Sequence, residues 1–410
     1  MKIRSVRALE ILDSRGNPTI QAEVALEDGT RAVAQVPSGA STGRHEACEL
    51  RDGEAARFDG KGTRQAVRNV EDVLAPAIRG LLTDHQRGVD ARLIEVDGSN
   101  DKSRLGANAM LAVSCAVART ATIARGVPLW RHLSEMSAKP APRMPAPMIN
   151  IISGGLHAGH NLEFQDFLAM PRGYPDLMSA LEATARVHRE TGRLLERRGC
   201  VLTGVADEGG WGPRLGSNEE AAALLREAIG VAGASMDIAL DVASTHFHED
   251  GGYRVEGKRL SSSEMADLLD GWVSRYGVAS IEDPCAEDDW DGWKAITSQL
   301  GSRVRLVGDD LFTTNPKRLE RGIAEGAANS VLVKMNQIGT LTETFAVIDR
   351  AREAGYGAVI SARSGETEDS FLADLAVASG AGQIKIGSVT RSERLAKYNR
   401  LLEIERWEFI

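Results

Sequence analysis

Apolar and polar residues alternate along the beginning of the chain. Residues 3–26 follow a strand-like alternation that is interrupted by the Gly-Asn-Pro turn at 16–18. Beyond Thr63, valine and leucine recur at helical spacing, and a second helix, rich in Ala, Leu and Val, is predicted at about 107–124. Strands followed by helices predict a small α+β domain over residues 1–135.

A proline-rich segment follows this region. Four prolines fall within residues 136–147, which is typical of a linker or an extended crossing between domains. We therefore place the domain boundary in this segment. The remaining residues, 148–410, form a second domain of about 260 residues.

A repeating pattern runs through the second domain. Short apolar runs end in a charged residue, at intervals of 22 to 41 residues, and the charged ends are Asp241, Glu282, Asp309, Lys334, Arg363 and Lys385. Helical segments such as 264–276 and 341–354 fill the gaps. Such units predict a β/α barrel, whose catalytic residues lie at the C-terminal ends of its strands. The alternative, an open doubly wound sheet, should carry a glycine-rich phosphate turn after its first strand, and we find no such motif.

The composition limits the binding partners and the cellular compartment that we expect for this protein. The 410 residues carry a net charge of −9, which argues against a nucleic-acid partner because such a partner needs a basic face. We find no signal-peptide pattern and no window that approaches the apolar length of a membrane span. We therefore expect a cytoplasmic protein without membrane contact. The four cysteines lie far apart without CxxC spacing, which favours free thiols over disulfides or zinc.

Three carboxylates end successive predicted strands: Asp241, Glu282 and Asp309. In a barrel they face one mouth, where their mutual repulsion favours a bound divalent cation. Hard oxygen ligands suit Mg²⁺. Any one of these residues taken singly is equally well explained as a helix N-cap, but three in succession favour a metal site.

Three cations belong to the same predicted mouth. A lysine beside a metal can have a depressed pKa, so that Lys334 can act as a base. Arg363 can fork onto a phosphate or a carboxylate, and Lys385 can hold a carboxylate. The alternative is that the lysines merely neutralise the acidic cluster.

Further candidates lie in loops. Glu208 precedes two glycines after the apolar run 201–205, where it is either a catalytic acid or an exposed turn residue. The segment 153–160, which contains His157, and the segment 37–43, which contains Ser41, are rich in small residues. Such loops often close over a ligand, although a plain surface turn is the better explanation of each loop taken singly.

Together these segments resemble the enolase family over nearly the whole chain. The matching segments are 13–19 (DSRGNPT), 36–43 (VPSGASTG), 103–109 (SRLGANA), 207–210 (DEGG), 280–284 (SIEDP), 308–312 (GDDLF), 334–341 (KMNQIGTL), 363–369 (RSGETED) and 391–399 (RSERLAKYN). The resemblance implies an α/β fold, in which an N-terminal α+β domain caps an eight-stranded β/α barrel with an irregular start.

The resemblance also implies roles and partners. Asp241, Glu282 and Asp309 would bind the first of two Mg²⁺ ions, and Ser41 the second together with the substrate phosphate. Lys334 would remove the α-proton of a small phosphorylated carboxylic acid, and Glu208 would protonate the departing hydroxyl. Lys385 would bind the carboxylate, Arg363 and Ser364 the phosphate, and His157 would line the loop side. Such proteins are homo-oligomers, dimers or octamers. Enolase-superfamily sites are known to use a Lys or His base together with Mg²⁺.

Three positions depart from the family pattern. Ala362 stands where the family has a histidine before Arg-Ser. Asp166, in the pair Gln165-Asp166, is one methylene shorter than the family's glutamate. Ser153 replaces an asparagine before two glycines. By analogy with the family, Asp166 and Ala362 border the reacting end of the substrate. These two substitutions therefore enlarge the site there and weaken its contacts with the substrate hydroxyl.

Three functions follow from the pattern. The clustered departures favour a secondary-metabolism paralogue that retains the enolate chemistry, similar to carboxyphosphonoenolpyruvate synthase, with a phosphonate as second substrate. The alternative is ordinary enolase activity, from 2-phosphoglycerate to phosphoenolpyruvate and water. A non-catalytic binding protein on the same scaffold is the third hypothesis, and the intact metal-ligand and acid–base residues count against it.

Overall fold

The computed structural model describes residues 1–40, 43–139 and 141–409. Its N-terminal domain begins with a three-stranded antiparallel sheet formed by β1 (Ile3–Leu12), β2 (Pro18–Leu26) and β3 (Arg31–Gln35). The turn predicted at 16–18 separates β1 from β2, and Gly16 has a φ of 77° there. This left-handed conformation is one that glycine adopts without steric cost.

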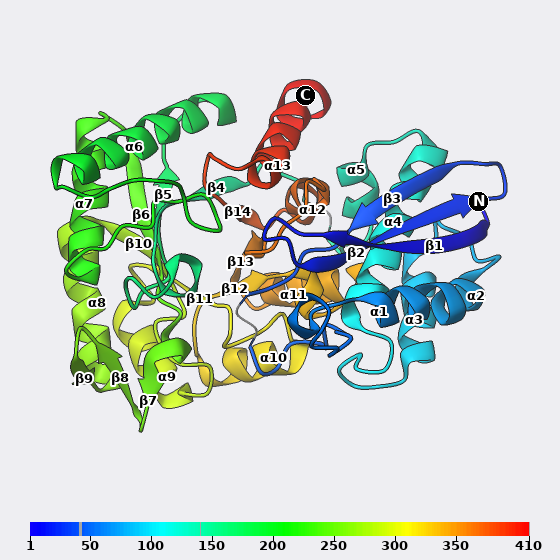
Figure 1. The fold of residues 1–410 in the computed structure, drawn as a ribbon, viewed down its shortest axis with the longest axis horizontal. Coiled ribbons are helices and arrows are strands. Elements are labelled where there is room, and N and C mark those ends of the chain that lie inside the picture. The colour runs from blue at the N-terminus through cyan, green and yellow to red at the C-terminus, as the bar shows by residue number, and fades with distance from the viewer. Residues whose placement is uncertain (41–42, 140, 410) are drawn as a thin grey trace.

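Helices cover one face of this sheet (Figure 1). The helical elements of the domain are the 3₁₀ turn η1 (Phe58–Gly60), α1 (Arg64–Asn69), the π-helical η2 (Val70–Leu74), α2 (Ala75–Ile78), α3 (Gln86–Asp97), α4 (Ala107–Arg125) and α5 (Leu129–Ser134). Of these, α1, η2, α2 and α4 contact the sheet. Both helices expected from the sequence are present, and Thr63 is the N-cap of the first. Helix α4 packs on β2 and β3, so that its apolar side chains form the centre of the domain core.

Helix α4 corrects the expectation that no segment reaches the apolar length of a membrane span. This 19-residue helix contains an 18-residue window with a mean hydropathy of 1.3, so it is long and apolar enough to cross a membrane by length and composition alone. However, 83% of that window is buried inside the protein. The alanine-rich face that gives the high hydropathy is the face that packs against neighbouring elements, which makes α4 a core helix.

The second domain is a closed barrel of eight strands. They are β4 (Ala146–Ser153), β5 (Asp166–Pro171), β6 (Met236–Asp241), β10 (Val278–Glu282), β11 (Arg305–Gly308), β12 (Ser330–Val333), β13 (Gly357–Ser361) and β14 (Gly382–Gly387). Strand β5 pairs antiparallel with both β4 and β6, whereas the other neighbours are parallel. The expected barrel with an irregular start is therefore confirmed.

Eight α-helices surround the barrel strands. They are α6 (Leu177–Arg197), α7 (Asn218–Val231), α8 (Ser262–Tyr276), α9 (Trp290–Leu300), α10 (Pro316–Glu325), α11 (Leu341–Glu353), α12 (Phe371–Ser379) and α13 (Ser392–Glu403). A small sheet of β7 (His248–Glu249), β8 (Gly252–Val255) and β9 (Lys258–Leu260) precedes α8. Shorter turns are η3 (Gly155–Ala158), η4 (Ser244–Phe247), η5 (Met335–Gln337) and the π-helical η6 (Ile404–Glu408).

One layer of apolar side chains fills the interior of the barrel. It consists of Met148, Leu168, Ala239, Val307, Leu332 and Val359, with Met170 packed against it. Successive side chains of a strand point to opposite faces, so residues two positions apart share a face. Positions two residues beyond this layer in the parallel strands include Asp241, Asp309 and Lys334. The alternation therefore places a polar layer directly above the apolar one, at the C-terminal mouth.

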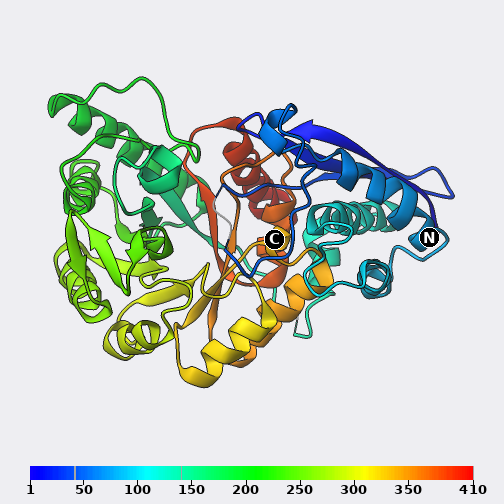
Figure 2. The same ribbon diagram turned by 60° about the horizontal axis from the view of Figure 1, so that its bottom comes forward.

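The two domains lie side by side and share a seam (Figures 1 and 2). The backbone N–H of Ser14 donates to Glu366 O at 2.7 Å, and Ser38 and Gly365 form an antiparallel bridge. These contacts join loops of the capping domain to the loop that follows β13. In the proline-rich segment, β4 already begins at Ala146, and Ser137 is buried and donates to Asp349 Oδ1 at 2.6 Å. The boundaries set at 135 and 148 stay a prediction.

Candidate active site

The three carboxylates predicted as metal ligands stand at neighbouring strand ends. Asp241 ends β6, Glu282 ends β10, and Asp309 follows the last residue of β11. The barrel helices α7 to α11 have Ser217, Ser261, Asp289, Asn315 and Thr340 as N-caps. The three carboxylates therefore cap none of these helices. Their placement needs another explanation, and metal binding supplies one.

Lys385 lies between two of these carboxylates. Its Nζ donates to Asp241 Oδ2 at 2.6 Å and to the two Glu282 oxygens at 2.9 and 2.8 Å. All three side chains are buried. The strand continues past Lys385 to Gly387, two residues further than the sequence pattern suggested.

The ionisation of these groups shows an excess of negative charge. Burial and the neighbouring charge of Asp241 raise the pKa of Glu282 well above its usual range. Burial also acts to raise the pKa of Asp241, but the ammonium of Lys385 outweighs it, and that pKa is lowered. Burial opposes the charge on Lys385, yet the two carboxylates raise its pKa well above the ordinary value. One ammonium does not balance two carboxylates here.

Lys334, the predicted base, follows β12 and is paired with Asp309. Its Nζ lies 2.5 Å from Asp309 Oδ2. Burial acts to lower the pKa of Lys334, but the Asp309 carboxylate outweighs burial and raises that pKa above its ordinary value. The direction of the shift depends on the partner that burial brings alongside, and the depressed pKa expected for Lys334 beside a metal ion stays a prediction.

Two residues without a predicted role position Asp309. Asp283 Oδ1 and Oδ2 accept the backbone N–H groups of Asp309 at 2.9 Å and Asp310 at 2.7 Å. Gln337 Nε2 donates to Asp309 Oδ1 at 3.1 Å. Both residues lie inside motifs that match the family, but sequence alone does not show which carboxylate they contact.

Gln165 adds an amide to the cluster. Its Nε2 donates to Asp241 Oδ2 at 3.3 Å, while its Oε1 is buried without a hydrogen-bond partner. Most buried polar atoms in proteins are hydrogen-bonded. An unpartnered amide oxygen beside the cavity is therefore a suitable contact for a bound ligand.

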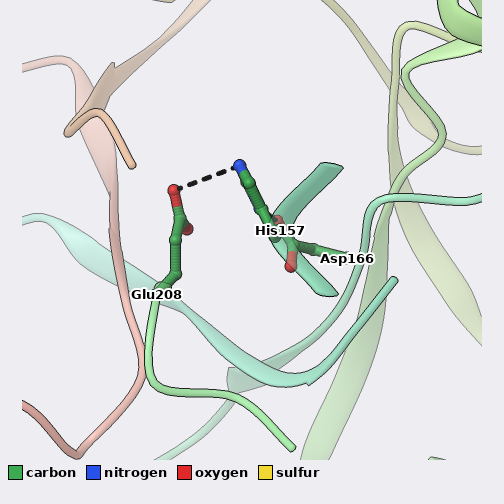
Figure 3. Close-up of side chains that lie close together, drawn as sticks. All are labelled: His157, Asp166 and Glu208. Atoms are coloured by element: carbon green, nitrogen blue, oxygen red, sulfur yellow. Dashed lines mark hydrogen bonds and ion pairs between the residues drawn. The ribbon is translucent and has the colours of Figure 1, made fainter. Parts of the chain in front are cut away.

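His157 lies between the carboxylates of Asp166 and Glu208 (Figure 3). Nδ1 is 2.9 Å from Asp166 Oδ2, and Nε2 is 3.8 Å from Glu208 Oε1. Burial opposes the charge on the imidazole, but the two carboxylates outweigh burial and raise the pKa of His157 to about 9. The ring is therefore an imidazolium at neutral pH, with one N–H directed to each side. The neighbouring His160 lies outside this triad.

The pKa values of the two carboxylates beside His157 shift in opposite directions. Burial raises the pKa of Asp166, and the charge of His157 offsets only part of that rise. Burial acts in the same direction on Glu208, but the charges of His157, Arg394 and Lys385 outweigh it and lower the pKa of Glu208. Glu208 is thus an ionised group whose nearest proton is on His157.

The turn that carries Glu208 is fixed by several contacts. The preceding run 201–205 has no regular secondary structure, and Val201 is 84% exposed. Gly209 has a φ of +89°, and a Cβ there would lie 2.5 Å from Thr390 Oγ1. That hydroxyl donates to Gly209 O at 2.7 Å. The glycine is required by both its conformation and the close approach of Thr390.

The predicted phosphate-binding residues lie at the domain seam. Arg363 Nη1 donates to Glu46 Oε2 and to Asn336 Oδ1, each at 3.0 Å. Ser364 Oγ accepts from Arg15 Nη1 at 3.2 Å. Glu46, from the capping domain, was not predicted, because its role depends on a contact between residues 317 positions apart. Ser41 lies outside the described residues.

A small cavity opens among these side chains. It is lined by His157, Gln165, Glu208, Asp241, Lys334, Ser361, Ala362, Arg363, Ser364 and Lys385. The proposed base, the proposed acid and the cationic groups therefore meet in one space. Ala362 contributes a methyl group to this wall, and Asp166 lies behind His157.

The fold and this cavity define a β/α-barrel enzyme with its acid–base groups at the C-terminal mouth. Residues 3–133 match the family profile described as "Enolase, N-terminal domain", and residues 141–407 match "Enolase, C-terminal TIM barrel domain". The chain belongs to the enolase family.

The acidic residues of the mouth fit a divalent metal ion. Asp241, Glu282 and Asp309 offer the hard carboxylate oxygens that Mg²⁺ prefers, and burial together with the neighbouring charge of Asp241 raises the pKa of Glu282. A second group, Asp283, Asp309 and Asp310, brings ligand atoms within 4.8 Å of one another. Within this group, Asp283 already accepts two backbone N–H groups, from Asp309 and Asp310.

Proposed function

We propose that this enzyme removes the α-proton of a phosphorylated carboxylic acid similar to 2-phosphoglycerate and forms a phosphoenolpyruvate-type product. The observation that carries the proposal is the shared cavity of Lys334, Glu208 and Lys385. Proton removal beside a carboxylate needs a base, a proton donor for the leaving group and cations where negative charge develops. All three kinds of group line the same wall.

Each residue has a defined part in this proposal. Lys334, as the neutral amine, accepts the α-proton at Nζ, and Glu208 passes a proton taken up from the His157 imidazolium to the departing hydroxyl. Lys385 holds the substrate carboxylate, while Arg363 and Ser364 hold the phosphate. Gln165 offers its free amide oxygen to the ligand.

Two Mg²⁺ ions complete the proposed site. Asp241, Glu282 and Asp309 would hold the first, and Ser41 the second. Bound there, the ions supply positive charge that stabilises the enolate.

We further propose that the enzyme is a secondary-metabolism paralogue, similar to carboxyphosphonoenolpyruvate synthase, with a phosphonate as second substrate. Support comes from Ala362, whose small side chain lines the cavity where the family has an imidazole. Asp166 also supports it, because its carboxylate is held by His157, Asn150 and Ser153. These features leave room at the reacting end of the substrate. We also propose a cytoplasmic homo-oligomer, a dimer or an octamer.

Phosphorus NMR of the purified protein with Mg²⁺ and 2-phosphoglycerate tests the proposal. We expect slow conversion of 2-phosphoglycerate alone and rapid consumption when a phosphonate co-substrate is added. Ordinary enolase activity is the second candidate, which the retained set Lys334, Glu208 and Lys385 favours. Rapid conversion of 2-phosphoglycerate alone to phosphoenolpyruvate would establish that candidate instead. No reaction with either mixture would contradict both.

A further inference from the structure

We propose that Asn150 and Ser153 are positioning residues that fix Asp166 and the Glu208 turn on opposite sides of His157. The proposal rests on the proposed function, because it assigns to this pair the geometry in which His157 serves Glu208. It adds two residues that touch neither the cavity nor the ligand.

The first part of the support is a closed hydrogen-bond network. Asn150 Nδ2 donates to Asp166 Oδ1 at 2.5 Å and to Ser153 Oγ at 3.0 Å. Ser153 Oγ donates in turn to Asp166 Oδ1 at 2.9 Å. Both hydrogens of the amide and the single hydrogen of the hydroxyl are thereby used. All three side chains are 0% exposed, so water does not compete for these bonds.

This network determines which oxygen of Asp166 faces His157. Two donors occupy Oδ1, and Oδ2 is left for Nδ1 of the imidazole at 2.9 Å. Fixing Nδ1–H on one side directs the other ring N–H of His157 toward Glu208 Oε1, 3.8 Å away. A histidine whose one nitrogen is held by a carboxylate presents the other in a set orientation.

The second part of the support is the contact of the same pair with the Glu208 turn. A Cβ on Gly210 would lie 2.8 Å from Asn150 Oδ1 and 3.0 Å from Ser153 Oγ, so the turn rests directly on the two side chains. Backbone bonds tie the strand to the turn as well: Ser153 N–H donates to Trp211 O at 2.8 Å, and Trp211 N–H donates to Ile151 O at 2.9 Å.

Asn150 and Ser153 therefore position both carboxylates that flank His157. Asp166 is attached to it by hydrogen bonds, and Glu208 by the packing of its glycine turn. Asn150 interrupts the otherwise apolar run of β4, which burial alone would not favour. A positioning role accounts for a buried amide at this place.

The experiment compares Ser153→Ala with a matched control, Ser114→Ala. Ser114 is also fully buried and donates to a buried carboxylate, Asp90 Oδ1, at 2.7 Å, but it lies in the core helix α4. The first readout is the Nδ1–H proton of His157 in ¹⁵N-histidine-labelled protein without substrate, assigned with His157→Gln. We expect this resonance to shift or disappear by solvent exchange in Ser153→Ala, and to stay unchanged in Ser114→Ala.

The second readout measures removal of the α-proton and loss of the hydroxyl group separately. With Mg²⁺ and 2-phosphoglycerate in D₂O, exchange of the α-proton reports Lys334, and loss of hydroxyl reports Glu208. In Ser153→Ala we expect elimination to fall by about tenfold, a partial loss of the roughly 10²–10⁴-fold that general acid catalysis contributes, while α-proton exchange changes by less than about twofold. Ser114→Ala should leave both rates unchanged.

The outcomes decide the proposal. It is overturned by an unchanged His157 resonance in folded Ser153→Ala, or by equal losses of exchange and elimination. If Ser153→Ala does not fold, Ser153→Cys replaces it, because the thiol keeps the volume and is a weaker donor, and it should give a smaller shift in the same direction. If wild-type protein neither exchanges nor eliminates, the proposed function fails, while the NMR comparison still decides the positioning role.

Discussion

Lys385 crosses the barrel to donate to both carboxylate oxygens of Glu282, at 2.9 and 2.8 Å. Their strands, β14 and β10, lie on opposite sides of the eight-stranded ring. The ammonium therefore stands at the centre of the mouth, beside the carboxylates that we assign to Mg²⁺. Lys385 therefore neutralises part of the negative charge that the metal ion is also proposed to neutralise.

Removing that internal cation should destabilise the protein. In Lys385→Met, Asp241 and Glu282 lose their buried partner, and breaking a buried ion pair typically costs about 3–5 kcal/mol. Unfolding in urea should show this loss without Mg²⁺ and a partial recovery with it. Lys294→Met is the control: its partner Asp291 is 95% exposed, so the change should have little effect on stability. A loss of similar size in both variants would contradict the assignment.

The charge on His157 should appear in the pH dependence of stability. Its pKa rises from 6.5 to about 9 on folding. A raised pKa contributes stability that is complete below about 6.5 and is lost as the pH rises through about 9. The difference in unfolding free energy between wild type and His157→Gln, on the order of 2–3 kcal/mol near pH 6, should therefore shrink toward pH 9. A difference that is constant across this interval would show that the imidazole is neutral.

An opposite pH dependence is expected for Glu10 in the capping domain. Arg57 and the backbone N–H of Thr63, against the effect of burial, lower the pKa of Glu10 from 4.5 to about 2. This contribution is present above about pH 4.5 and is lost as the pH falls toward 2. Because the pair is partly exposed, Glu10→Gln should cost about 1 kcal/mol or less at pH 7. The cost should vanish in unfolding measured near pH 2, and persistence there would indicate a packing effect instead.

The departures at 166 and 362 predict a gain of function. Asp166→Glu together with Ala362→His should raise the rate of 2-phosphoglycerate dehydration, because the imidazole and the longer carboxylate return to the reacting end of the substrate. Asp166 is fully buried, so the extra methylene should also cost about 1–3 kcal/mol of stability. Phosphorus NMR measures the rate and urea unfolding the cost. No gain in a folded double variant would refute our account of these two positions.

Much of this architecture could be predicted from the sequence because the signals are local. Apolar runs that end in a charge placed Asp241, Glu282 and Asp309 at strand ends, and the same rule placed Lys334 just past β12. The alternation of strand side chains then directs such residues to one mouth. The long sequence motifs indicated the enolase family.

The residues that were missed act through non-local contacts. Asn150 reads as a polar interruption in an apolar strand, and only the folded chain shows that its amide meets Asp166. Glu46 reads as one more acidic residue of a loop, yet it accepts from Arg363 across the domain seam. The pairing of Lys334 with Asp309 is missed for the same reason, since Asp309 comes to it from another strand.

The contacts between the two domains limit which domains of homologous proteins can be joined in one chain. Ser14 and Ser38 pair with the backbone of 365–366, and Arg15 donates to the hydroxyl of Ser364. The cavity wall at Ser364 is thus held by a second segment, which lies some 350 residues away in the chain. A chimera that joins the first domain of one homologue to the barrel of another should inherit a mismatched wall unless both segments come from the same parent.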